Sequence, residues 1–66
     1  MTPVTEITVL GGHRFRVEGG PEQIEAQILA AARGSIMEFA WLTESETGER
    51  IGLNPEHVLM LRAPAV

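Results

Sequence analysis

Residues 43–62 read TESETGERIGLNPEHVLMLR and carry the strongest structural signals in this chain of 66 residues. The run predicts a hairpin that turns at residues 46–48, then a single helical turn opened by Asn54 and Pro55, because asparagine caps a helix and proline cannot donate to a sheet ladder. A closing strand from Val58 to Arg62 follows, and it is apolar on both faces. A strand of that kind needs two covers, which a chain this short can hardly supply. We therefore expect self-association or a partner surface.

The first third of the chain predicts a second hairpin. Residues 5–9 and 13–18 alternate between apolar and polar side chains, which is the period of a half-buried strand. A three-residue loop at residues 10–12 pairs Ile7 with Phe15 and unites the apolar sets on one face, whereas a two-residue loop would separate them. The same register sets Glu6 across from Arg16 as a favourable cross-strand pair.

Residues 21–33 predict a helix, since Pro21 suits the first helical position and Gly34 follows as a stop signal. Its apolar stripe consists of Ile24, Ile28, Ala31 and Ala32.

Residues 36–43 predict a third strand whose two faces are both apolar. Met37, Phe39 and Trp41 fall on one face, and Ile36, Glu38, Ala40 and Leu42 fall on the other. An aromatic pair at strand spacing beside a helix is usually core, so we expect Phe39 and Trp41 to pack beneath the helix. A three-residue loop at residues 46–48 then pairs Trp41 with Leu53 and sets Glu44 across from Arg50.

Together these elements predict an α+β fold of order β-β-α-β-β-β. We expect one small domain over residues 1–66, with frayed ends at 1–3 and 63–66, and a mainly antiparallel sheet of about five strands with one helix packed on one face. A chain of this size buries only about 60% of the surface of its unfolded form, and such small domains commonly need disulfides, a metal or oligomerisation. The sequence contains no cysteine, so oligomerisation is the supplement that remains.

The layout resembles small uncharacterised proteins and terminal modules of actinobacterial, hence bacterial, type. These often end in a valine-asparagine-proline-x-x-valine motif, which residues 53–58 (LNPEHV) match except for leucine at the first position. The resemblance covers most of the chain. It implies a fold and no activity.

Composition limits the classes of function. Hydrophobic residues make up 44% of the chain and charged residues 21%, which is ordinary globular usage. The formal net charge of -4 disfavours attraction to nucleic acid or anionic lipid. No apolar run approaches a membrane span, and the first residues do not match a signal peptide. We expect a soluble cytoplasmic protein.

Catalysis, metal binding and cofactor binding find little support in the residues. His13 and His57 are the only imidazoles and lie far apart in sequence, whereas a metal site needs several ligands at one point. Ser35 and Ser45 lie at a helix end and in a turn, where serine serves local hydrogen bonding. The paired glycines fit neither phosphate-binding fingerprint. We expect that the chain is not an enzyme and that it binds neither a metal nor a cofactor.

The most favoured function is a non-catalytic interaction or assembly module that self-associates, with a dimer favoured. The expected interface is the second apolar face, listed as Ile36, Ala40, Leu42, Leu59 and Leu61. One alternative is a small DNA-binding regulator that uses Arg14 and Arg16 on the first hairpin, although the net charge has the wrong sign for it. The other alternative is an accessory subunit that docks on a larger enzyme.

Overall fold

The computed structural model of the chain describes residues 3–34 and 38–64. Its elements are β1 (Val4–Val9), β2 (Arg14–Glu18), α1 (Pro21–Ala32), β3 (Ala40–Thr43), β4 (Arg50–Leu53), the single 3-10 turn η1 (Pro55–His57) and β5 (Val58–Arg62). This order confirms the predicted α+β fold. The side chain of Asn54 accepts a hydrogen bond from the amide of Glu56 at 2.9 Å, so Asn54 caps η1 as its sequence suggested.

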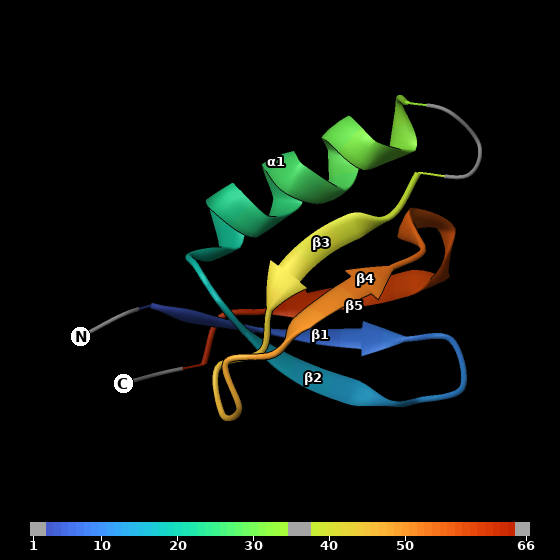
Figure 1. The fold of residues 1–66 in the computed structure, drawn as a ribbon. Helices are drawn as coiled ribbons and strands as arrows, with labels where there is room; N and C mark the ends of the chain where they lie inside the picture. Colours follow the sequence, from blue (N-terminus) through green and yellow to red (C-terminus); the bar gives the residue numbers. More distant parts are fainter. Residues whose placement is uncertain (1–2, 35–37, 65–66) are drawn as a thin grey trace.

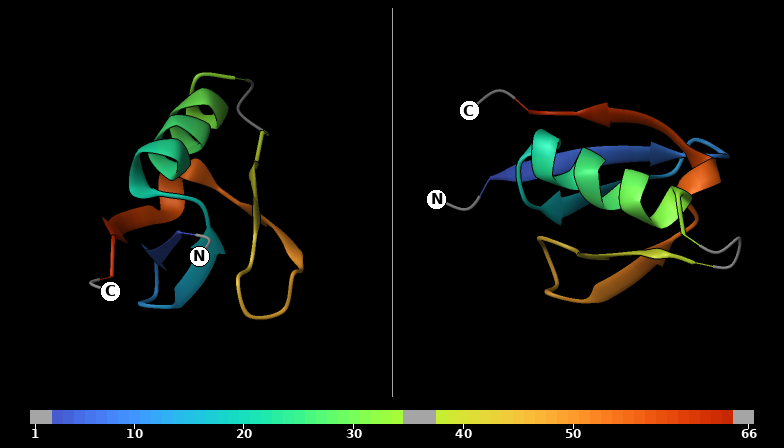
Figure 2. Two further views of the ribbon diagram at one scale, coloured as in Figure 1. Left: turned by 90° about the vertical axis from the view of Figure 1, so that its left-hand side faces the viewer. Right: turned by 90° about the horizontal axis from the view of Figure 1, so that it is seen from above.

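The five strands are divided between two antiparallel sheets rather than one. The larger sheet has the order β2-β1-β5, and the smaller sheet is the hairpin β3-β4. Figure 1 shows α1 above the strands, and the two views in Figure 2 show that it lies over the larger sheet, with the β3-β4 hairpin standing to one side. The two sheets meet at an isolated bridge between Val17 and Glu44, beside which the amide of Ser45 donates to the carbonyl of Arg16 at 2.8 Å.

The first hairpin has the predicted register. Ile7 lies opposite Phe15 and Glu6 opposite Arg16, and the chain turns through the three residues of the predicted loop. Gly11 and Gly12 adopt φ angles of +94° and +85°, a region that glycine enters without steric cost. The alternation of the two strands therefore fixed this loop correctly.

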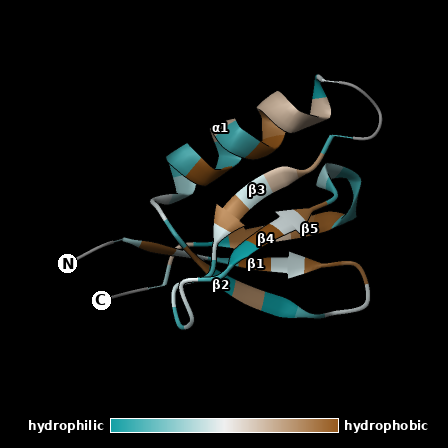
Figure 3. Ribbon diagram, in the orientation of Figure 1, coloured by the Kyte–Doolittle hydropathy of each residue, from teal (hydrophilic) through white to brown (hydrophobic). Residues whose placement is uncertain are grey.

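The core lies between α1 and the inner faces of the two sheets. It consists of Ile7, Val17, Ile24, Ile28, Ala31, Ala40, Leu42 and Leu53. Figure 3 shows the corresponding banding of α1, where hydrophobic and hydrophilic turns alternate along the ribbon. Ala32, a member of the predicted apolar stripe, is exposed, and the buried side of α1 consists of Ile24, Ile28 and Ala31.

The second hairpin corrects the predicted register by one residue. Ala40 pairs with Leu53, Trp41 with Gly52 and Leu42 with Ile51, so Trp41 does not face Leu53. The amide of Glu44 donates to the carbonyl of Glu49 at 2.8 Å, which leaves a four-residue loop at 45–48 in place of the predicted three. Because side chains alternate along a strand, a one-residue slip reverses the faces.

The reversal puts the small side chain of Ala40 and that of Leu42 into the core and turns Trp41 outward. The expected burial of Phe39 and Trp41 beneath the helix is therefore wrong. Ile24 and Ile28 already fill the space under α1, and Ala40 leaves room for them where an indole would not.

Candidate interaction surface

An exposed aromatic pair is the most prominent feature of the smaller sheet. Phe39 immediately precedes β3 and Trp41 lies within it, and they are 47% and 56% exposed. Their ring centroids are 6.4 Å apart with an interplanar angle of 75°, an edge-to-face arrangement that is favourable for aromatic side chains. They share the outer face because Ala40, between them, points into the core. We name Phe39 and Trp41 the aromatic pair.

Trp41 covers the backbone of the neighbouring strand. A Cβ atom placed on Gly52 would lie 3.2 Å from the Cη2 and Cζ2 atoms of the indole. Gly52 is nevertheless exposed, because its position on β4 is at the outer edge of the hairpin. An aromatic ring laid over a strand glycine shields backbone that would otherwise be bare on that face.

The outer edge of β4 is free. In the part of the chain that the structure describes, β4 pairs with β3 and with no other strand. Figure 2 shows β4 as the outermost strand of the hairpin in both views. Because hydrogen-bonded and non-hydrogen-bonded pairs alternate in an antiparallel ladder, the bonded pair Glu44–Glu49 implies a bonded pair at Leu42–Ile51. The backbone groups of Arg50 and Gly52 therefore point away from β3.

A groove of about 320 Å³ lies where the first half of α1, the end of β2 and β3 meet. Trp41 and Thr43 line one wall and Gln23 and Gln27 the other. Glu18 and Arg50 also line it, so most of the groove is polar. The groove is open to solvent and adjoins the aromatic pair at Trp41.

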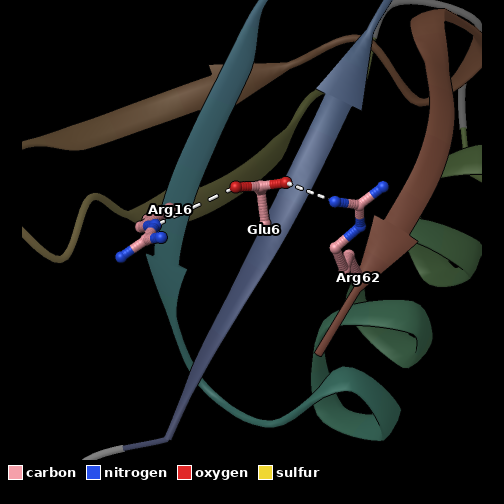
Figure 4. A network of polar contacts seen from close by, with 3 residues as sticks. All are labelled: Glu6, Arg16 and Arg62. Carbon is pink, nitrogen blue, oxygen red and sulfur yellow. Dashed lines mark ion pairs between the residues drawn. The ribbon is translucent and has the colours of Figure 1, made fainter. Parts of the chain in front are cut away.

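A small charge network occupies the outer face of the larger sheet (Figure 4). The carboxylate of Glu6 lies 3.9 Å from Arg16 Nε and 4.0 Å from Arg62 Nη1. The pairing of Glu6 with Arg16 confirms the prediction, whereas the contribution of Arg62 depends on β5 lying beside β1, which the sequence did not assign. Arg14 is exposed on β2. Of the two arginines suggested for DNA contact, Arg16 is thus engaged by a carboxylate.

The residues predicted to form an interface differ in their exposure. Ala40 and Leu42 are only 2% and 3% exposed, so they belong to the core of the chain itself. Leu61 is half-buried and packs against that core, whereas Leu59 is exposed because the register of β1 and β5 shifts between Thr8 and Val9. Ile36 lies outside the described residues. The sequence-based prediction did not identify Trp41 as a surface residue. The available signal was Gly52, the glycine that pairs with Trp41 on β4.

The two histidines are both exposed at one end of β1. The carbonyl of His13 accepts from the amide of Val9 at 2.9 Å, and the carbonyl of His57 accepts from the amide of Leu10 at 2.8 Å. Within residues 3–34 and 38–64, however, no three histidine or acidic side chains gather as a metal site would require. In the part of the chain that the structure describes, no helix has the length and apolar character that crossing a membrane requires.

Comparison with known proteins adds no relative: no family model, no curated protein and no solved structure matches this chain.

Proposed function

We propose that this chain is a non-catalytic interaction and assembly module that forms a homodimer through its β3-β4 hairpin. The observation that carries the proposal is the exposed aromatic pair beside the free edge of β4. We further propose a cytoplasmic location, which the globular composition and the lack of cysteine support.

Two physical arguments support an interaction role for this hairpin. Tryptophan is enriched among the residues that dominate binding energy at protein interfaces, because it buries a large area at little conformational cost. A free strand edge also presents unpaired amides and carbonyls that another strand can satisfy. The hairpin combines both features, since Trp41 lies on β3 and the free edge belongs to β4.

The small size of the chain supports self-association as the form of that interaction. Within residues 3–34 and 38–64, eight apolar side chains make up the buried core, and the sequence contains no cysteine to reinforce it. Small domains of this kind gain stability when a partner covers more of their apolar surface.

The proposal is tested by measuring the mass of the protein in solution at micromolar concentration. We expect about twice the 7.2 kDa of the single chain. Trp41→Gln and Phe39→Gln should shift the mass toward that of one chain, because each removes apolar area at the interface. Leu29→Gln is the matched control, since it removes an exposed leucine from α1 and should leave the mass unchanged.

A wild-type mass of 7.2 kDa under these conditions would contradict the proposal. A mass that fell with Leu59→Gln but not with Trp41→Gln would instead move the interface to β5, which carries two of the predicted interface residues, Leu59 and Leu61.

A further inference from the structure

We infer that the two copies join through antiparallel pairing of their β4 strands, with Ile51 on the two-fold axis and Arg50 of each copy beside Trp41 of the other. This inference rests on the proposed function and names the register of the interface. It follows from which backbone groups of β4 are free, which registers they allow and what each register places side by side.

The free edge of β4 supplies complementary backbone groups. Arg50 and Gly52 lie in the non-hydrogen-bonded positions of the β3-β4 ladder, so their amides and carbonyls face outward. An antiparallel strand can satisfy these groups only if its own outward residues lie opposite them. A second copy of β4 meets that condition, since the same two residues are outward in it.

Symmetry leaves three registers for such a pair, with the axis at Arg50, Ile51 or Gly52. An axis at Arg50 would set the two guanidinium groups directly opposite each other, which is unfavourable. An axis at Gly52 would pair Arg50 with Asn54, whose backbone carbonyl already accepts from the amide of His57 at 3.0 Å where η1 begins. The axis at Ile51 avoids both conflicts.

With the axis at Ile51, each Arg50 exchanges both of its backbone hydrogen bonds with Gly52 of the other copy. Residues directly opposite in a sheet point to the same face, so Arg50 of one copy lies next to the indole that covers Gly52 of the other. A guanidinium that reaches over the exposed face of the indole forms a cation–π contact. On the opposite face the half-buried Ile51 side chains meet across the axis and extend the apolar surface.

The charge pattern of the hairpin fits this arrangement. Among the described residues, the ion pairs of this chain involve Arg16 and Arg62, and Arg50 takes part in none of them. Arg50 is exposed on the same face as Trp41, because Thr43 pairs with Arg50 as Trp41 pairs with Gly52. One edge of each chain thus carries both a cation and an aromatic ring. In a two-fold dimer, each cation would contact the aromatic ring of the other copy, so the contact would form twice.

The experiment uses single-cysteine variants, in each of which the introduced thiol is the only one because the sequence contains no cysteine. Non-hydrogen-bonded pairs bring opposed Cα atoms to about 4.5 Å, within the range that a disulfide spans. We expect Ile51→Cys to form a disulfide-linked dimer under mild oxidation at micromolar protein. It should do so about tenfold faster than Glu49→Cys, which lies off the axis, or Glu25→Cys on the exposed side of α1.

Because Ile51 packs against the core, a second readout tests the register independently of any loss of stability in Ile51→Cys. Arg50→Ala should weaken dimerisation about five- to thirty-fold through two lost cation–π contacts, and Arg50→Lys should retain most of the affinity. A dimer that persists with equal crosslinking at all three cysteine positions, or with undiminished affinity in Arg50→Ala, would overturn this register while leaving the proposed function standing. A monomer would overturn both.

Discussion

The indole of Trp41 lies so close to Gly52 that the two residues form one structural unit on the outer face of the β3-β4 hairpin. A Cβ atom at Gly52 would approach the ring to 3.2 Å, closer than an ordinary van der Waals contact. The absence of a side chain at Gly52 therefore leaves room for the indole to rest against the strand, although Trp41 is 56% exposed.

The first prediction concerns that contact. Gly52→Val should displace the indole, since a branched side chain occupies the position where the ring lies. The change should appear as an altered near-ultraviolet circular dichroism signal of the single tryptophan. Gly20→Ala is the control, because a Cβ at Gly20 meets no atom within 4 Å and should leave the signal as in the wild type. An unchanged signal in Gly52→Val would mean that the ring does not rest on this strand.

The second prediction concerns the core beneath α1. Ile28→Ala should lower the free energy of unfolding by about 2–4 kcal/mol, because it removes a buried side chain and leaves a cavity. Leu29→Ala removes a neighbouring side chain that is 45% exposed, and its cost should remain below about 1 kcal/mol. Denaturant unfolding at equal protein concentration measures both. Equal costs would show that the helix presents a different face to the sheets.

The third prediction concerns Thr5, whose hydroxyl donates to the carbonyl of Gly19 at 2.8 Å in a buried position. Thr5→Val keeps the shape of the side chain but leaves that carbonyl without its donor, at a cost of about 1–3 kcal/mol. Thr8→Val, on the outer face of the same strand, makes the same chemical change away from the core and should cost much less. If thermal unfolding gave similar losses for the two variants, the Thr5 hydrogen bond would contribute little.

The fourth prediction concerns Glu6 between its two arginines. Glu6→Gln removes the charge while keeping the size of the side chain, and it should cost about 0.2–1 kcal/mol for each of the two pairs. The loss should shrink at high salt, although only in part, because the Glu6 side chain is 13% exposed. Glu18→Gln on the adjacent strand is the control, since no ion pair is found for Glu18 among the described residues. A loss that did not change with salt would indicate packing rather than charge.

The two hairpins show why the fold was predictable and one of its faces was not. In the first hairpin, polar residues alternate strictly with Ile7, Phe15 and Val17, so only one loop length brings the apolar residues together. The strand before the second turn offers apolar residues on both faces, and parity then allows either register. The size of tryptophan argued for burial, yet the core beside Ile24 and Ile28 accommodates Ala40 instead.

The pairing of β5 with β1 depends on long-range contacts that no local sequence pattern predicts. Glu6 lies opposite Arg62, more than fifty positions away in sequence, and this neighbour completes the charge network on the outer face. Strand order of this kind is fixed by how the whole core closes, so the sequence indicated the existence of β5 but not its place.

One isolated bridge links the two sheets in the described residues, so we expect the β3-β4 hairpin to open as a unit of the native state. Apart from Val17 and Glu44, with the adjoining bond from Ser45 to Arg16, no ladder in the described residues ties the hairpin to the larger sheet. Opening the hairpin would break little backbone pairing, and its cost lies mainly in exposing Leu42 and Leu53 to water. A partner strand on β4 adds to that cost by mass action. Opening of the hairpin would then require dissociation of the dimer. The exchange rates of the slowest amides in this hairpin should therefore fall as the protein concentration rises.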